Sequence, residues 1–312
     1  MSNNKQSHKG KKEFIKFIFI TILIALSIRA TVIYSFTIPT PSMENTLLVG
    51  DFMLANRFVY GLRSPDWIGI PWTKIGFTIP YIKTRGLRSP RQGDFVIFKN
   101  PRDVSEYWVK RCIAVSGDLV YIKNKQVYVN GNMYTANGVQ HRDFLLDSTF
   151  HQQQIYPPGS GNIHNYGPIR IPEPGQKIIF TDSNREEWIT WFQIMVYEGN
   201  TLQVVLGKQA IDLTSENGEN WRRYIASVPI NCFLVNNKTL KEYEYSINDP
   251  QYFVMGDNRD NSLDSRYFGF LPERYIVGEP LIVLFSIDKD VPLYRLFDKV
   301  RWDRFFTLTG SL

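Results

Sequence analysis

Cysteine and histidine are scarce in this sequence, and their spacing argues against several classes of site. The chain of 312 residues holds only two cysteines, Cys112 and Cys232, so no disulfide framework is expected to hold the fold together. Neither a C-x-x-C pair nor an H-x-x-x-H spacing occurs, which argues against a zinc site. The histidines beyond the N-terminus, His141, His151 and His164, lie in loop-like sequence away from any nucleophile-like motif. We therefore expect no metal site.

Long apolar runs are also lacking, with one exception at the N-terminus. Residues 14–36 (FIKFIFITILIALSIRATVIYSF) contain an apolar run that reaches the roughly 20 residues needed to span a bilayer. Five lysines crowd the first sixteen residues, which is typical of a cytoplasmic flank. We predict a basic cytoplasmic tail over 1–13, a transmembrane helix over 14–36, and the rest of the chain outside the cytoplasm. The alternative is a cleaved signal peptide with Ala25-Leu26-Ser27 as its small-x-small site, but the apolar character resumes after Arg29 and favours an anchor.

Charge and composition narrow the partners and the fold class. The net charge of +6 could suggest nucleic acid, but the basic run beside the apolar segment is better explained as a topology signal, so we expect no nucleic acid. Hydrophobic residues make up 43% and charged residues 21%, an ordinary globular balance. Short runs rich in aromatic and β-branched residues, broken by glycine and proline, favour strands. The predicted fold is mainly β, with an N-terminal transmembrane helix, an all-β core and a large inserted β domain.

Strand and turn signals place the boundaries of these parts. Strands are predicted over 94–99, 106–115 and 275–286, and Asn-Gly turns between apolar segments predict hairpins from residue 119 to about 246, including a strand in EEWITWFQIMVY. We assign the core to 37–118 and 251–290, the insert to 119–250, and a C-terminal tail to 291–312. In the tail, residues 292–306 place apolar side chains on one helical face and predict a short amphipathic helix.

Residues 60–90 have no sustained period of either kind. Large aromatic and aliphatic side chains, such as Trp67, Trp72 and Phe77, alternate with glycine, proline and basic residues. The segment is either a loop packed on the core or a surface at the membrane interface, where tryptophan and tyrosine are enriched.

Ser42 lies directly after the apolar segment, in the stretch Thr37–Met43 (TIPTPSM). Pro39 and Pro41 fix φ and push their preceding residues toward extended geometry, so we expect Ser42 to be presented on a stiff, non-helical backbone. A serine hydroxyl is a weak nucleophile at neutral pH and needs a base. An isolated serine of this kind is usually an ordinary turn residue, so the case depends on the rest of the chain.

Lys110 offers such a base. In the predicted strand 106–115 it shares a face with Trp108 and Cys112, which supply part of an apolar pocket. A lysine acts as a base only if its pKa falls by roughly three units from about 10.4, which corresponds to about 4 kcal/mol and can be reached by burial. An exposed edge-strand lysine is the alternative. A serine-lysine dyad is thus compatible with the residues, whereas a Ser-His-Asp triad lacks its histidine.

Four motifs, in order, resemble those of type I signal peptidases, the serine-lysine endopeptidases of bacterial membranes. Ile38–Leu47 (IPTPSMENTL) resembles the family box I-P-S-x-S-M-x-P-T-L, and Gly93-Asp94 resembles its R-G-D box. Residues 108–111 (WVKR) resemble Y-x-K-R, and residues 256–266 (GDNRDNSLDSR) match G-D-N-R-D-N-S-x-D-S-R throughout. The last match is highly specific. The insert resembles the variable second domain of the family only in position and β character.

The resemblance implies a role for each matched residue. Ser42 is the nucleophile and Lys110 the general base, while the hydroxyl of Thr40 and the N–H of Ser42 form the oxyanion hole. Thr40 replaces a serine and keeps its hydroxyl, and Asn45 replaces a proline, which we expect to loosen the turn. Ser262 would hydrogen-bond the lysine amine, and Asp264 would pair with Arg266. Two further residues of the matched boxes, Met43 and Arg111, are assigned as supporting residues.

The function implied is removal of N-terminal signal peptides from exported preproteins after small-x-small sites, through an acyl-enzyme and without metal or cofactor. The implied partners are preproteins and the lipid bilayer. The implied location is the inner (plasma) membrane, crossed once, with the N-terminus cytoplasmic and the catalytic part on the periplasmic side. Two alternatives remain open. One is another serine-lysine processing protease, such as a repressor-type autoprotease, and the other is a membrane-anchored β binding module without catalysis.

Overall fold

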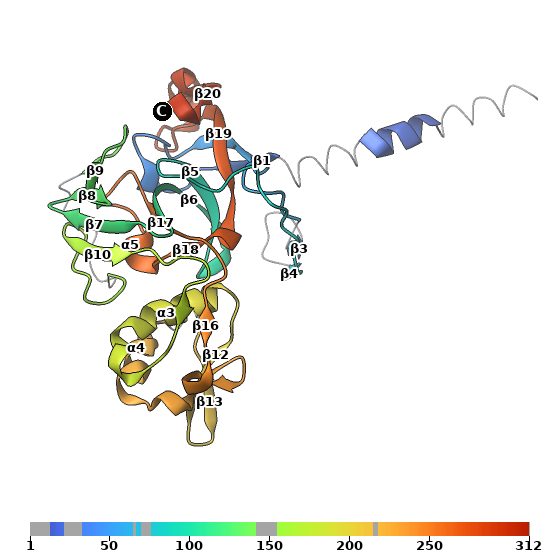
Figure 1. Ribbon diagram of the computed structural model, residues 1–312. Helices are drawn as coiled ribbons and strands as arrows, with labels where there is room; N and C mark the ends of the chain where they lie inside the picture. The colour runs from blue at the N-terminus through green and yellow to red at the C-terminus, as the bar shows by residue number, and fades with distance from the viewer. Residues whose placement is uncertain are drawn as a thin grey trace, which may run out of the picture.

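The computed structural model describes residues 13–21, 33–64, 67–69, 76–141, 155–214 and 218–311. Its centre is an eight-stranded sheet, shown in the upper part of Figure 1. The path along the sheet runs β1 (Ile33–Thr37), β2 (Asp51–Asn56), β19 (Ile276–Ser286), β5 (Phe95–Asn100), β6 (Asp103–Val115), β17 (Gln251–Met255) and β18 (Leu271–Pro272), with β20 (Thr307–Leu308) also pairing with β19.

The sheet is antiparallel throughout, and its strands bury side chains on both faces. Alternate residues of β5 enter different clusters, because Val96 and Phe98 pack with Cys112 while Ile97 packs with Met53 and other residues. The sequence predicted β5, β6 and β19 close to their observed bounds. Both faces of this sheet are therefore covered, and a polar side chain that points into either cluster loses contact with water.

The predicted transmembrane helix is only partly described. Residues 13–21 are helical, and residues 22–32 lie outside the described part of the chain. The end of the prediction is wrong, because residues 33–37 form β1, whose Thr37 pairs with Phe52 of β2. Within the described ranges, no helix has the length and apolar character needed to cross a bilayer.

The insert contains helices as well as strands. Its first part is a four-stranded sheet of order β10-β7-β8-β9, formed by β7 (Leu119–Lys123), β8 (Gln126–Val129), β9 (Asn132–Tyr134) and β10 (Tyr166–Arg170). Its second part, at the bottom of Figure 1, combines helices α3 (Trp188–Tyr197) and α4 (Gly218–Ser227) with two small sheets. These sheets are formed by β12 (Leu202–Leu206), β13 (Gln209–Asp212), β14 (Phe233–Val235) and β15 (Lys238–Thr239), and by β11 (Lys177–Ile178) with β16 (Tyr245–Ser246).

Helix α3 corrects the predicted strand in EEWITWFQIMVY. Its aromatic and β-branched residues resemble a strand, but the segment is apolar on all sides and most of it is buried. Trp188 and Phe192 pack against Phe180 and Phe233 at the centre of a core cluster. A helix places such a run wholly within a core, and short apolar runs do not distinguish the two structures by period. The insert is therefore not an all-β domain.

The predicted C-terminal amphipathic helix is also wrong. The tail forms short turns: η7 (Leu293–Arg295), the single-turn helix α6 (Leu296–Lys299) and η8 (Trp302–Arg304). Its apolar side chains face solvent, as with Phe297, which is 81% exposed. Charged side chains attach it instead, since Arg304 donates to both carboxylate oxygens of Asp51 at 2.9 and 2.6 Å. Such a bidentate pair, with Asp51 fully buried, holds the tail to the core sheet.

Candidate active site

Ser42 lies in the 3-10 turn η1 (Pro41–Met43), just after β1. The N–H of Ile38 donates to the carbonyl of Asp51 at 3.0 Å, so the chain stays beside β2 until the prolines turn it. Met43 is buried in the cluster around Ile97 and anchors the turn. Two details correct the sequence prediction: Ser42 sits in a helical turn, and it is only 8% exposed. The fixed φ of Pro41 suits the first position of such a turn.

The backbone after Ser42 forms a tight turn in which Asn45 is essential to the geometry. Glu44 has φ −55° and ψ 148°, Asn45 has φ 79°, and the N–H of Thr46 donates to the carbonyl of Met43 at 3.1 Å. These are the features of a type II turn, whose third residue needs positive φ. Proline, with φ near −65°, cannot adopt the observed φ. Asn45 therefore does more than loosen a turn, because it gives this box a backbone that a proline there excludes.

Lys110 lies at hydrogen-bond distance from Ser42. Its Nζ donates to the Ser42 Oγ at 2.7 Å and to the carbonyl of Val109 at 3.1 Å. The side chain is 4% exposed, lies opposite the buried Val96 in the sheet, and places Nζ 5.5 Å from the ring centroid of Trp108. Sequence reasoning thus predicted the strand and the place of Trp108 beside this lysine.

Burial accounts for the acidity of this ammonium group. Desolvation lowers the pKa of Lys110 from 10.5 to about 8, against the carboxylates of Asp264 and Asp257, which raise the pKa. With a pKa of about 8, about one lysine in ten is neutral at pH 7. That neutral amine, already bonded to Ser42, can accept the hydroxyl proton.

Thr40 lies beside Ser42 and is exposed to solvent. Its Oγ1 is 3.4 Å from the Ser42 Oγ. A hydroxyl at this distance is near enough to meet an oxyanion that forms on a carbonyl attacked by Ser42. The contribution of Thr40 and the Ser42 N–H to an oxyanion hole stays a prediction.

The segment 256–266, which we call the polar loop, packs directly on the Ser42 turn. Asn258 donates its N–H to the Ser42 carbonyl at 3.1 Å and its Nδ2 to the Pro41 carbonyl at 3.2 Å. The last residues of the polar loop begin helix α5 (Ser265–Phe268). Asp264 caps this helix by accepting a hydrogen bond from the Arg266 N–H at 3.2 Å. Sequence reasoning assigned no role to Asn258, and only its place within the matched box pointed to it.

Asp264 and Arg266 form the predicted pair. The guanidinium donates through Nε and Nη2 to both carboxylate oxygens at 2.9 and 2.8 Å, with both side chains buried. Burial raises the pKa of Asp264, but Arg266 and the N–H of Gly256 outweigh it and lower this pKa below its usual value. The pair therefore remains ionised and rigid beneath the polar loop.

Arg111 makes a second buried pair, with Asp257. Its Nε and Nη2 donate to the two carboxylate oxygens at 2.8 and 2.7 Å. Asp257 also accepts from the hydroxyl of Thr46 at 2.6 Å, so one carboxylate joins the residue after Lys110 to the turn after Ser42. The supporting role predicted for Arg111 thus has a structural basis, while the parts of Asp257 and Thr46 were missed.

The structure corrects one sequence expectation about the polar loop and shows a histidine beside this loop. Ser262 is buried, but its hydroxyl has no hydrogen-bond partner among the described residues, because the Lys110 amine is directed to Ser42 and Val109 instead. The hydroxyl rests against Gly256, where a Cβ would overlap it. The histidines are also not all remote, since His164 Nε2 lies 3.6 Å from the Asp260 carboxylate.

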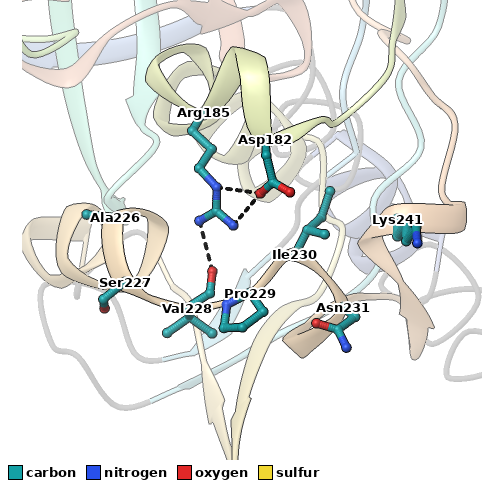
Figure 2. A pocket seen from close by; sticks show the side chains of 9 residues that line it. All are labelled: Asp182, Arg185, Ala226, Ser227, Val228, Pro229, Ile230, Asn231 and Lys241. Atoms are coloured by element: carbon teal, nitrogen blue, oxygen red, sulfur yellow. Dashed lines mark hydrogen bonds and ion pairs between the residues drawn. The ribbon is translucent and has the colours of Figure 1, made fainter.

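A cavity in the insert shares no residue with this site. The cavity has a volume of about 540 Å³ and lies between η2 (Asp182–Glu187) and the end of α4 (Figure 2). Its Arg185 pairs with Asp182 and donates to the Val228 carbonyl at 2.8 Å, so these groups satisfy one another. Within the described ranges, no three His, Cys, Asp or Glu side chains are grouped to hold a metal ion. Both cysteines are free thiols.

This chain is similar over most of its length to curated proteins named signal peptidase I. The protein of Buchnera aphidicola is 28% identical and covers 91% of this chain and 79% of its own. That of Helicobacter pylori is 27% identical, with 94% and 91% covered. That of Aquifex aeolicus is 28% identical, with 88% and 84% covered.

A family match extends over the buried serine, the lysine and both arginine pairs. The sequence pattern described as "Signal peptidase, peptidase S26" matches residues 11–187 and 194–285, which include every residue of the site above. With well over half of the chain matched, this protein belongs to the signal peptidase family, peptidase S26.

Proposed function

We propose that this chain is a membrane-anchored serine endopeptidase that removes N-terminal signal peptides from exported preproteins. The observation that carries the proposal is the 2.7 Å hydrogen bond from the buried Lys110 amine to the Ser42 hydroxyl. Family membership and the names of the similar proteins support the substrate class. The expected cleavage site follows two small side chains, one and three residues before the cut, as in the A-x-A signal.

The chemistry follows from the dyad. Neutral Lys110 takes the proton of Ser42 as Oγ attacks the scissile carbonyl, and the oxyanion forms between the Ser42 N–H and the Thr40 hydroxyl. The lysine ammonium then gives its proton to the departing amine, which leaves an ester on Ser42. Lys110, neutral again, takes a proton from water as the water oxygen attacks the ester. When the bond from the acyl carbon to Oγ breaks, the lysine ammonium returns this proton to Ser42 and the new carboxyl group is released. The dyad returns to its starting state without a cofactor.

The proposed location is the inner (plasma) membrane, with the N-terminus in the cytoplasm and the site on the periplasmic side. The apolar run in residues 14–36 and the lysines before it support this orientation. The lipid bilayer is accordingly a partner of the protein in addition to preproteins. Protease protection of the catalytic part in sealed inside-out vesicles tests the orientation, and digestion of that part from outside would contradict it.

Loss of either member of the dyad tests the function. Ser42→Ala and Lys110→Ala should each abolish cleavage of a preprotein by the detergent-solubilised protein while the fold is kept. Lys110→Arg should fail as well, because a guanidinium stays protonated in proteins and cannot act as a base. Wild-type turnover in any of the three folded variants would contradict the dyad.

A further inference from the structure

One segment of the insert, Asn137–Gln140, contacts the active site directly. It follows β9, and Gln140 forms a parallel bridge with Asn258 of the polar loop. The N–H of Gln140 donates to the Asp257 carbonyl at 2.9 Å, and the N–H of Arg259 donates back to the Gln140 carbonyl at 3.1 Å. The segment is therefore bonded through its backbone to the polar loop, whose Asn258 bonds the Ser42 carbonyl.

The same segment also packs against the turn after Ser42. Gly138, at φ +80°, lies so close to Thr46 that a Cβ on it would overlap the Thr46 hydroxyl oxygen. The Gln140 Nε2 donates to the Glu44 carbonyl at 3.4 Å. Since the Thr46 hydroxyl bonds Asp257 at 2.6 Å, the contact with Gly138 falls on a group that already joins turn and loop.

A third contact joins the segment to Arg111, the residue after Lys110. The carbonyl of Asn137 accepts from Arg111 Nη2 at 3.2 Å, while the same guanidinium bonds Asp257. The segment thus touches the chain next to Lys110, the turn after Ser42 and the loop behind both. These three parts are far apart in sequence, and the segment supplies contacts to each.

We propose that segment 137–140 of the insert is a positioning element for the Ser42–Lys110 dyad, with Gly138 and Gln140 as its positioning residues. This proposal rests on the proposed function and gives the insert a part in it. A shift of about 1 Å in reacting groups can lower a rate about a hundredfold. A Cβ at Gly138 must displace either Thr46 or the segment, and both lead to the backbone that carries Ser42.

The test compares two glycine substitutions in the full-length protein with a preprotein substrate. Gly138→Ala should lower kcat at least tenfold and leave KM within about twofold, because the dyad moves while the substrate-binding surface stays. Gly131→Ala is the matched control, since Gly131 has φ +84° and no atom within 4 Å of its would-be Cβ. Gly131→Ala should lower the melting temperature through the same backbone strain, but its kcat should equal that of the wild type.

A double variant tests the route of the effect. If Gly138 acts through Thr46, the losses of kcat in Gly138→Ala and Thr46→Ala should not multiply in the combination. Multiplying losses would overturn the route. If Gly138→Ala does not fold, Gln140→Ala decides, with an expected loss of about threefold in kcat against the exposed Gln126→Ala as its control.

The outcomes separate this proposal from the function itself. No cleavage by the wild-type protein would contradict the proposed function. Cleavage by the wild type, with Gly138→Ala equal to Gly131→Ala or Gln140→Ala equal to Gln126→Ala, would overturn only the positioning role.

Discussion

The pH dependence of cleavage should report the pKa of Lys110. The base is neutral in its working form, so kcat/KM should rise with pH and level off above the pKa of about 8. From the neutral fractions, about 0.01 at pH 6 and about 0.5 at pH 8, we expect kcat/KM to increase about fiftyfold between these pH values. Initial rates on a preprotein at substrate concentrations well below KM measure this. An apparent pKa near 10.5, or a flat profile, would refute a desolvated lysine base.

The same burial predicts an effect on stability. The folded-state pKa of about 8 lies below the unfolded value of 10.5, so the unfolded state binds more protons between these values. Stability should therefore rise as pH increases from 8 to 10.5, and below pH 8 the buried ammonium costs up to about 3 kcal/mol.

Lys110→Met, which keeps the apolar stem, tests this effect. It should be inactive, yet more stable than wild type at pH 7, and this gain should shrink toward pH 10 in denaturant unfolding. A less stable Lys110→Met at pH 7 would mean that the bonds to Ser42 and Val109 outweigh the desolvation.

Three further predictions follow from the geometry. Asn45→Pro should lower the melting temperature and kcat because proline cannot adopt φ 79°, whereas Asn45→Gly should be tolerated. An Asn45→Pro variant as stable as the wild type would contradict the assigned turn. Thr40→Val should lower kcat roughly 10²–10³-fold with little change in KM, and a loss below threefold would leave the Ser42 N–H as the main oxyanion donor. A fragment that begins at Ile33 should co-sediment with liposomes through exposed side chains such as Phe77 and Ile82. Replacing both side chains by serine should weaken the partition of the fragment into liposomes about a hundredfold. Unchanged sedimentation of this variant would contradict an interfacial surface.

The last of these predictions depends on a segment that the structure describes only in part. Strands β3 (Trp67–Gly69) and β4 (Gly76–Thr78) pair in a small two-stranded sheet, seen at the right below β1 in Figure 1. Phe77 is 62% exposed, which favours a surface over a packed loop at that position. The side chain of Trp67 and residue 72 lie outside the described part of the chain, so the sequence alternatives for these tryptophans remain predictions.

Residue type and alternation along the sequence predicted the strands of the core sheet whose structure these local patterns determine. Strands β5 and β6 are rich in β-branched and aromatic residues, and an apolar environment around Lys110 followed from the alternation along β6. Helix α3 and the C-terminal tail were mispredicted because tertiary packing decided them. For α3, an apolar run can be buried equally well as a helix or as a strand. For the tail, the Arg304–Asp51 pair joins residues 253 positions apart, which periodicity cannot reveal.

The site shows the same division. Ser42, Lys110 and the Asp264–Arg266 pair were predicted because a reaction and a matched motif require those residue types. Asn258 and the 137–140 segment were missed because they act largely through backbone groups and close approach, for which side-chain chemistry offers no signal. Thr46 was missed because its hydroxyl bonds a carboxylate 211 positions away in the sequence. The positive φ of Asn45 is an intermediate case, since its departure from the family box was noted and its conformation was not.

The two arginine pairs explain how a buried lysine can lose its proton beside two carboxylates. Asp264 and Asp257 both raise the pKa of Lys110, and unpaired they would hold the ammonium charged. Arg266 and Arg111 each bind one of them through two hydrogen bonds, which keeps both carboxylates rigid and sets a positive charge beside each negative one. At Lys110 desolvation outweighs the two carboxylates and decides the direction of the pKa shift. The apolar surroundings of Lys110 therefore set the sign of its pKa shift, while each arginine gives one nearby carboxylate an ion pair of its own.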